Sequence, residues 1–174
     1  DNTCGKRFCR KLGDLPEGYD HKYTYSHLGY NLKITDMQAA CALAQMDRVE
    51  EFIAQRRANF AYYARALGGL PGVELQPEAP WGRHSRWLTC LTIDPAIAGV
   101  TREQVRLALE AENIEARPVW KPMHLQPVFA SAEMHGGKVS ARLFDQGLCL
   151  PSGAGLSEED RGRVITTFTQ AFNR

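Results

Sequence analysis

A proline-stiffened segment in the second half of the chain gathers the side chains best suited to binding a charged, ring-containing ligand. These side chains are Arg117, Trp120, Lys121 and His124. Prolines fix the backbone around them, which suits a rigid wall that presents cations and an aromatic face. A nucleotide-linked sugar would offer a diphosphate to the cations and rings to the tryptophan. On spacing alone, a core tryptophan and a surface histidine are the favoured interpretation.

A second candidate for ligand binding is Asn31, which lies in a loop directly before a predicted helix. An amide donor close to a helix start is suited to holding an anion such as a phosphate. An asparagine in this position is also commonly a simple cap or turn residue. The pattern leaves both interpretations open.

A third pattern resembles a metal site and consists of Cys4, Cys9, His21 and His27. Its order and gaps approach those of a two-cysteine, two-histidine zinc finger. In such a finger the histidines share one helix, whereas here tyrosines separate them and glycines and a proline interrupt the stretch where that helix would form. A tyrosine-rich loop with incidental histidines is the favoured interpretation, and a small metal protein remains an alternative.

The elements that must position these residues begin with one long predicted helix. Residues 1–34 are irregular, and Thr35 and Gln38 then form a capping box. No glycine or proline interrupts residues 35–67, and apolar side chains recur there every three or four residues. A helix of this length would extend roughly 45–50 Å, more than a domain of this size covers alone. We therefore expect it to lie against another domain or subunit, with Met46, Phe52, Phe60 and Tyr63 promoting self-association.

The remaining pattern predicts a small α+β layer with helices on one face of a short sheet. Strands are expected at 73–75, 87–93 and 148–150, with an extended segment at 115–120 and a loop over 121–138. Helices are expected at 102–112 and 139–146 and after a cap at Ser157. The predicted organisation is thus an irregular segment, 1–34, left over from a larger domain, followed by a long helix and a small C-terminal domain, 35–174.

Composition narrows the class of protein. Hydrophobic residues make up 44% and charged residues 24% of the 174 residues, and the formal net charge is +1. This balance does not indicate a nucleic-acid or membrane partner, and no apolar run predicts a membrane span or signal peptide. A cytoplasmic protein is therefore expected, with reduced cysteines at 41, 90 and 149 acting as small core residues. The start at Asp1, without a methionine, is typical of a fragment or a processed chain.

Two stretches give the sequence a resemblance to a known family. "GYNLKITDMQAACALAQMDRVEEFIAQRRANFAYY" resembles the segment that follows the cofactor lysine in DegT/DnrJ-type sugar aminotransferases, which depend on pyridoxal phosphate and act on nucleotide-linked keto-sugars. "ARPVWKPMHLQPVF" and "LFDQGLCLPSG" resemble the C-terminal part of the same family. The resemblance implies the small C-terminal domain of the aspartate-aminotransferase-like fold, known as fold type I.

The two halves resemble different members of that family. The first half, with "DNTCGKRF", is similar to CDP-4-keto-6-deoxyglucose 3-dehydrases, which use pyridoxamine phosphate and an iron–sulfur cluster. That likeness would make Cys4 a counterpart of a cluster ligand. The second half is more similar to aminotransferases of UDP-linked 4-keto-sugars. Amination and deoxygenation therefore both remain open.

The resemblance also implies roles for individual residues. Asn31 would contact the cofactor phosphate of a neighbouring subunit in a homodimer, and Arg117, Trp120, Lys121 and His124 would line the edge of the sugar-nucleotide site. The part of the family that carries the Schiff-base lysine, or the histidine that replaces it, has no counterpart among these residues, so no catalytic residue is assigned. We therefore expect a C-terminal piece that is inactive alone. The alternative is a stand-alone, non-catalytic dimerisation or binding module.

Overall fold

A small antiparallel sheet forms the centre of the molecule and confirms the predicted α+β class. The computed structural model describes residues 28–30 and 34–172. Four strands have the order β1-β2-β4-β3, and each neighbouring pair is antiparallel. Their bounds are β1 Val73–Leu75, β2 Thr89–Ile93, β3 Arg117–Pro118 and β4 Gly147–Leu150. The edge strand β3 is short because Pro118 cannot donate a backbone hydrogen bond.

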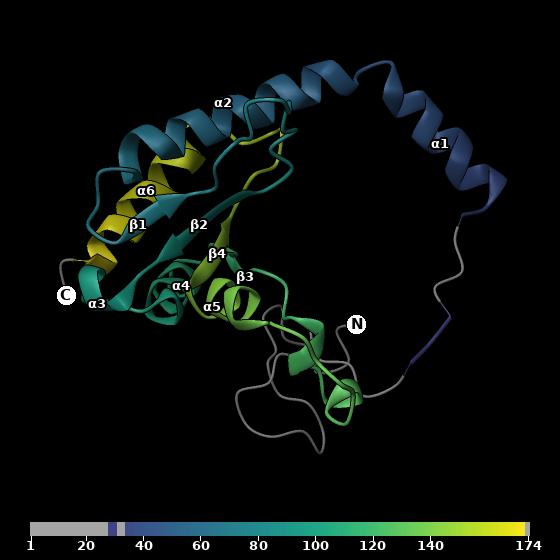
Figure 1. The fold of residues 1–174 in the computed structure, drawn as a ribbon. Helices are drawn as coiled ribbons and strands as arrows, with labels where there is room; N and C mark the ends of the chain where they lie inside the picture. The colour runs from purple at the N-terminus through teal and green to yellow at the C-terminus, as the bar shows by residue number, and fades with distance from the viewer. Residues whose placement is uncertain (1–27, 31–33, 173–174) are drawn as a thin grey trace.

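Three helices cover one face of this sheet, as the sequence predicts (Figure 1). They are α2 (Val49–Leu67), α4 (Arg102–Ala111) and α6 (Glu158–Phe172). Alternate residues of β2 are buried, so Leu91 and Ile93 pack into a core shared with Leu148, Leu150 and Phe168. Cys90 and Thr92 of β2 carry the other half of the alternation on the opposite face and are only partly buried.

The single long helix predicted for residues 36–67 is in fact two helices, α1 (Asp36–Met46) and α2. The capping box of Thr35 and Gln38 is present at the start of α1. At the break, the Arg48 N–H donates to the carbonyl of Gln45, three residues back, and tightens the turn. Arg48 then pairs with Glu51 and lies over the Phe52 ring, where α2 begins. Apolar periodicity continues through the turn, which is why the sequence does not reveal it.

The apolar residues expected to face a partner separate into two groups. Tyr63 is fully buried within the chain, and Phe60 packs beneath the guanidinium of Arg86. For these two residues the expectation of an external partner is wrong, because α6 and the β1–β2 loop cover them. Met46 at the end of α1 is 59% exposed, and α1 has no buried residue.

The shorter elements connect the sheet to its surroundings. The helix α5 (Lys138–Gln146) leads directly into β4, and two 3₁₀ turns, η1 (Met123–Leu125) and η2 (Pro127–Phe129), lie in the loop expected after residue 120. The helix α3 (Pro95–Ala98) was not predicted, although Asp94 followed by proline is a start signal: its carboxylate accepts from the Ala96 N–H. Cys149 is buried and Cys90 half-buried, but Cys41 is exposed on α1, so its predicted place in the core is wrong.

Candidate functional site: a cavity between two tryptophans and α6

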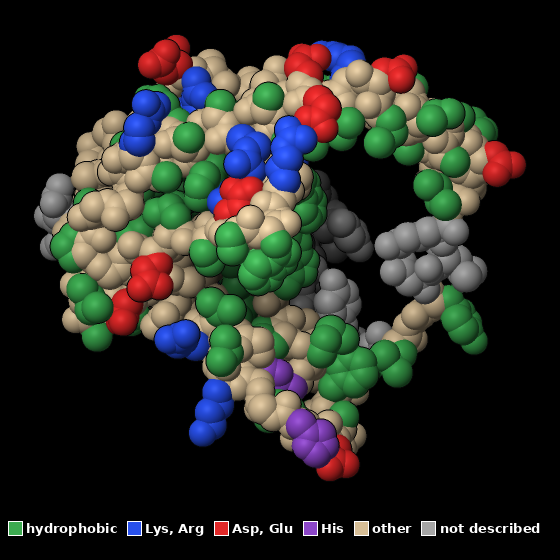
Figure 2. Space-filling view, turned by 45° about the horizontal axis from the view of Figure 1, so that its top comes forward, with side chains coloured by type: hydrophobic (Ala, Val, Ile, Leu, Met, Phe, Trp, Pro, Cys, Tyr) green, Lys and Arg blue, Asp and Glu red, His purple; other side chains and the backbone are tan. Residues whose placement is uncertain are grey.

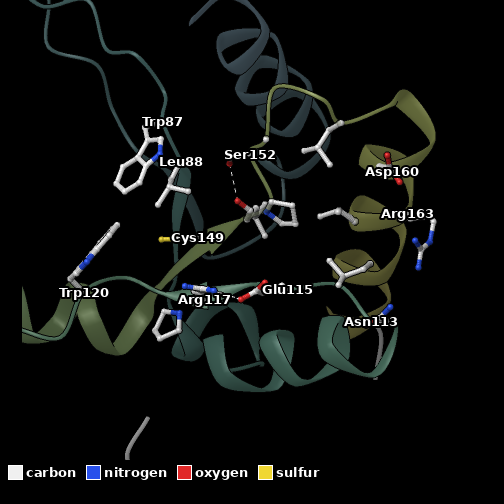
Figure 3. Close-up of a pocket in the computed structure, with 17 residues that line it drawn as sticks. Trp87, Leu88, Asn113, Glu115, Arg117, Trp120, Cys149, Ser152, Asp160 and Arg163 are labelled. Atoms are coloured by element: carbon white, nitrogen blue, oxygen red, sulfur yellow. Dashed lines mark hydrogen bonds and ion pairs between the residues drawn. The ribbon is translucent and has the colours of Figure 1, made fainter. Parts of the chain in front are cut away.

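A cavity of about 610 Å³ opens beside β4 and the edge strand β3 (Figure 3). It runs from Trp87 and Trp120 on one side to Asp160 and Arg163 of α6 on the other. Between them its lining comes from the α4–β3 connection, from β3 and β4, and from the loop after β4. The residues in this middle part are Asn113, Ile114, Glu115, Arg117, Pro118, Cys149, Leu150, Pro151, Ser152, Gly153 and Leu156.

The loop after β4, which forms one rim of the cavity, is held from beneath by α2 and from the side by β2. Asn59 and Tyr63 of α2 donate to the carbonyls of Gly153 and Pro151 at 2.9 and 3.0 Å. Burial raises the pKa of the Tyr63 hydroxyl, which keeps it a donor. Ser152 Oγ accepts from the Thr89 N–H at 2.7 Å and donates to the Leu150 carbonyl. The rim is therefore fixed by the same residues that build the core.

The loop between β1 and β2, which leads to Trp87, is fixed by an ion cluster that joins Glu78 and Arg86 of the loop to Arg57 of α2. Glu78 pairs with Arg57 at 2.8 Å and with Arg86 at 3.2 Å, and its carboxylate also accepts from the His84 N–H. These hydrogen bonds, above all those from Arg57, lower the pKa of Glu78 to about 2. Arg86, which is 4% exposed with φ at 53°, stacks 3.6 Å from the Phe60 ring centre.

Trp87 and Trp120 form an aromatic pair at the mouth of the cavity. Arg56 of α2 donates to the carbonyl of Trp87 at 3.0 Å and fixes its backbone. The two ring centres are 5.9 Å apart with the planes inclined by 33°, and both side chains remain more than half exposed. Two tryptophans held in this way offer flat apolar surface to a planar ligand. Trp87 was missed in the sequence, although it begins the β-rich stretch that contains β2.

Arg117 brings positive charge to the floor of the cavity next to Cys149. Its Nε donates to Glu115 Oε1 at 2.7 Å, and a second guanidinium nitrogen bonds to the same oxygen. On the far side, Arg163 donates to the Glu112 carbonyl at 3.0 Å. The pair of Arg117 and Glu115 is partly exposed, so an incoming anion could exchange with the carboxylate without leaving a buried charge unpaired.

The four residues singled out on the proline-stiffened segment are not all brought together. Arg117 and Trp120 line the cavity, but Lys121 and His124 do not. His124 packs against Gly137, where a Cβ would lie 3.0 Å from the imidazole Cε1, so its ring fills space in the loop. Partial burial lowers the pKa of the Lys121 ammonium. After β3 the chain leaves the sheet (Figure 1), and the 3₁₀ turns η1 and η2 follow.

Asn31 and Cys4, together with Cys9, His21 and His27, lie outside the described residues. Their predicted roles in binding cofactor phosphate or a metal therefore stay predictions.

The cavity does not fit a Schiff-base cofactor by itself. Among the described residues that line it there is no lysine, and its two acids are already engaged: Glu115 by Arg117 and Asp160 by Ser157. Pyridoxal phosphate chemistry needs a lysine or a substitute, and an acid to pair with the ring nitrogen. No cofactor step is derived from this cavity.

Comparison with known families decides the affiliation of the chain. The model of the DegT/DnrJ/EryC1/StrS aminotransferase family matches residues 7–169. The chain belongs to this family. Proteins of the family and their structural neighbours depend on pyridoxal or pyridoxamine phosphate.

Curated relatives include a protein named as a 3-dehydratase and one named as a perosamine synthase. The chain is 42% identical to the lipopolysaccharide biosynthesis protein RfbH of Salmonella typhimurium, over 99% of this chain and 40% of RfbH. It is 49% identical to a dTDP-4-dehydro-2,6-dideoxy-D-glucose 3-dehydratase of Saccharopolyspora spinosa, over 67% of this chain and 25% of that protein. It is 36% identical to GDP-perosamine synthase of Caulobacter vibrioides, over 88% and 41%. The chain thus spans well under half the length of these relatives.

Solved structures agree with the predicted fold type. DesI, determined in the presence of its TDP-sugar product, aligns with a TM-score of 0.72 and 29% identity over 84% of this chain and 38% of DesI. DesV of S. venezuelae, in complex with a ketimine intermediate, aligns with a TM-score of 0.71 and 27% identity over 90% of this chain and 42% of DesV. Fold type I is therefore established. Among the described residues, none of the helices combines the length and apolar character that a membrane span requires.

Proposed function

We propose that the chain is the nucleotide-facing part of a pyridoxal- or pyridoxamine-phosphate-dependent enzyme of nucleotide-sugar metabolism, either a 4-keto-sugar aminotransferase or a 3-dehydratase. The single observation that carries the proposal is the cavity between Trp87, Trp120 and Arg117 in a chain of this family. The sequence shared with RfbH and the dehydratase supports the choice of substrate class.

The two tryptophans supply the larger share of the proposed binding. Stacking of a base on an aromatic side chain is worth about 1–3 kcal/mol and tolerates different bases. The two indoles already lie against one another, and Arg56 fixes the backbone of Trp87, so part of the stacking surface is formed before a ring enters. This arrangement fits a nucleoside or sugar ring and does not select which nucleotide is bound.

Arg117 supplies the contact to the diphosphate. A guanidinium binds phosphate oxygens in a planar, bidentate geometry, and the partly exposed Glu115 is the group that phosphate would displace. Lys121, four residues along, stays a predicted contact that would require the 121–137 loop to turn toward the cavity in the assembled enzyme. His124 is proposed at the outer edge of the same site.

Turnover is proposed to require the part of the relatives that this chain does not match. Cofactor binding then draws on that part, with Asn31 reaching the phosphate of the cofactor across a homodimer. The exposed apolar residues of α1, which include Met37, Leu43 and Met46, support the dimer (Figure 2). The same exposed residues fit a stand-alone dimerisation module equally well. Binding of a nucleotide sugar would exclude that alternative, and its absence would favour it.

A titration of the 174-residue chain with nucleotide diphosphate sugars tests the proposal. Isothermal calorimetry against dTDP-, UDP-, GDP- and CDP-hexoses should show one saturable site for at least one of them. Trp120→Ala should weaken this binding by about 5- to 150-fold, since one stacked ring is lost. Arg117→Ala should weaken binding of the nucleotide diphosphate but not of the nucleoside.

Trp81 offers a matched control because its side chain is 89% exposed and does not line the cavity. Trp81→Ala should leave the affinity unchanged. Equal losses for Trp81→Ala and Trp120→Ala, or no binding of any nucleotide sugar by a folded chain, would overturn the proposal and favour the dimerisation module.

A further inference from the structure

Two cysteines face each other across the sheet beneath the tryptophan pair. Cys90 of β2 and Cys149 of β4 are direct partners in the antiparallel register, and their sulfur atoms are 3.6 Å apart. Their neighbours Leu91 and Leu148 point into the core, so both thiols lie on the opposite face. Neither nucleotide binding nor packing of the core requires cysteines at these two paired positions.

The backbone geometry fits a bond between them. Partners in an antiparallel pair have Cα atoms about 4.5–5.5 Å apart. Disulfides span Cα separations of about 4.4–6.8 Å. Closing the bond would therefore need rotation of the side chains and no change of register.

A small molecule can reach this pair through the cavity. Cys149 lines the cavity, and Cys90 is half-buried. The hydrogen bond from Cys149 and the nearby guanidinium of Arg86 lower the pKa of Cys90, whereas the Cys90 contact and burial raise the pKa of Cys149. Cys90 is also the more exposed of the two thiols, so it is the one that a small disulfide meets first, with Arg86 and Arg117 close to the pair.

We propose that Cys90 and Cys149 form an oxidative modification site, at which a low-molecular-weight disulfide of the glutathione type converts the two thiols into an intrachain disulfide on the cavity floor. The Cys90 thiolate attacks one sulfur of the small disulfide and expels one small thiolate. Cys149 then gives up its proton and attacks Cys90 Sγ, which expels the second small thiol. Two protein thiols are oxidised by two electrons in total, and one small disulfide is reduced to two thiols that carry the two protons.

A variant that retains only these two cysteines gives a direct test. The chain has five cysteines, so Cys4→Ser, Cys9→Ser and Cys41→Ser together leave Cys90 and Cys149. Incubation with oxidised glutathione, alkylation and digestion without reduction should show loss of both free thiols and one peptide pair linked between them. The linked chain should also unfold at a higher urea concentration, an increase that dithiothreitol reverses, because the bond constrains the unfolded chain.

Two controls separate the fold from the chemistry. In the same background, Cys149→Ser should accumulate a glutathione adduct on Cys90 because the resolving thiol is missing. Oxidation in guanidinium should give glutathione adducts and intermolecular bonds instead of the linked pair. Thiols that stay free in the folded chain, glutathione retained on both cysteines, or an equal yield of the linked pair in guanidinium would each overturn the proposal.

Discussion

The sheet with its three helices and the α1 segment are both rich in apolar residues, yet only the first buries them. In the sheet and helices, Phe168, Leu91 and Tyr63 are almost completely inaccessible to solvent. In α1, Met37 is 81% and Leu43 is 72% exposed. The difference shows that the apolar side chains of the body pack against one another, whereas those of α1 have no such cover among the described residues, as the proposed dimer requires.

The largest expected effect is a difference in the free energy of unfolding between a core variant and a variant of α1. Phe168→Ala should lower the free energy of unfolding by about 3–5 kcal/mol because it leaves a cavity among α2, α6 and the sheet. Met37→Ala on α1 should change it by less than about 0.5 kcal/mol. Urea denaturation at protein concentrations where the chain is monomeric measures both. Similar losses for the two variants would mean that α1 packs on the body.

Removing a hydrogen bond at the cavity rim should have an intermediate effect. Ser152→Ala should cost about 1–3 kcal/mol, since the Thr89 N–H is left buried without its acceptor. Ser140→Ala is the matched control, because its hydroxyl donates to Gly137 on an exposed surface. Urea denaturation of both variants measures the difference, and an unchanged midpoint for Ser152→Ala would show that the rim is not tied to β2.

Self-association should depend on the apolar side of α1. Leu43→Asp should weaken dimerisation by about 10-fold or more, because a charge would be desolvated in the interface. Gln45→Asp places the same charge at another exposed position of the helix and should have a smaller effect. Sedimentation velocity over a range of concentrations measures both. A wild-type chain that stays monomeric at the highest concentration would contradict the dimer.

The smallest expected effect concerns the ion cluster that fixes the β1–β2 loop. Because the folded pKa of Glu78 is lowered to about 2, its ionised form stabilises the fold above the ordinary carboxyl pKa. This contribution is lost as the pH falls from about 4.5 toward 2. Glu78→Gln should therefore flatten the acid side of the stability profile in that window. Urea midpoints measure this profile. If they fall equally in both proteins as the pH is lowered, Glu78 does not stabilise the fold.

The sequence predicts the fold class well because its signals are local. The capping boxes at Thr35 and Thr101, the β-rich stretch of β2 and the prolines after β3 each act within a few residues. The turn at Asp47–Arg48 escapes prediction because the apolar period continues through it. Because of this turn, α1 extends away from the sheet and its helices. Its direction depends on long-range contacts, which a local sequence pattern does not predict.

The candidate site was predictable only in part. Arg117 and Trp120 stand on one segment and are predicted together, whereas Trp87 reaches the cavity from the distant β1–β2 loop, and Cys149 reaches it through the register of β4 with β2 and β3. Lys121 and His124 follow Trp120 on the same segment, but the chain leaves the cavity after Trp120, so neither side chain lines it. Residue type indicates what a side chain could bind, and the register of the sheet decides which of them meet.

If this chain provides the nucleotide-facing wall of a cofactor pocket but not the residues that bind the cofactor, the two ligands should behave differently. The most direct measurement compares two ligands on one sample of the folded chain. Calorimetry should detect a nucleotide diphosphate sugar, while incubation with pyridoxal phosphate followed by borohydride reduction and mass spectrometry should find no stoichiometric lysine adduct. A single lysine labelled at full occupancy, with the matching Schiff-base absorbance, would contradict the account.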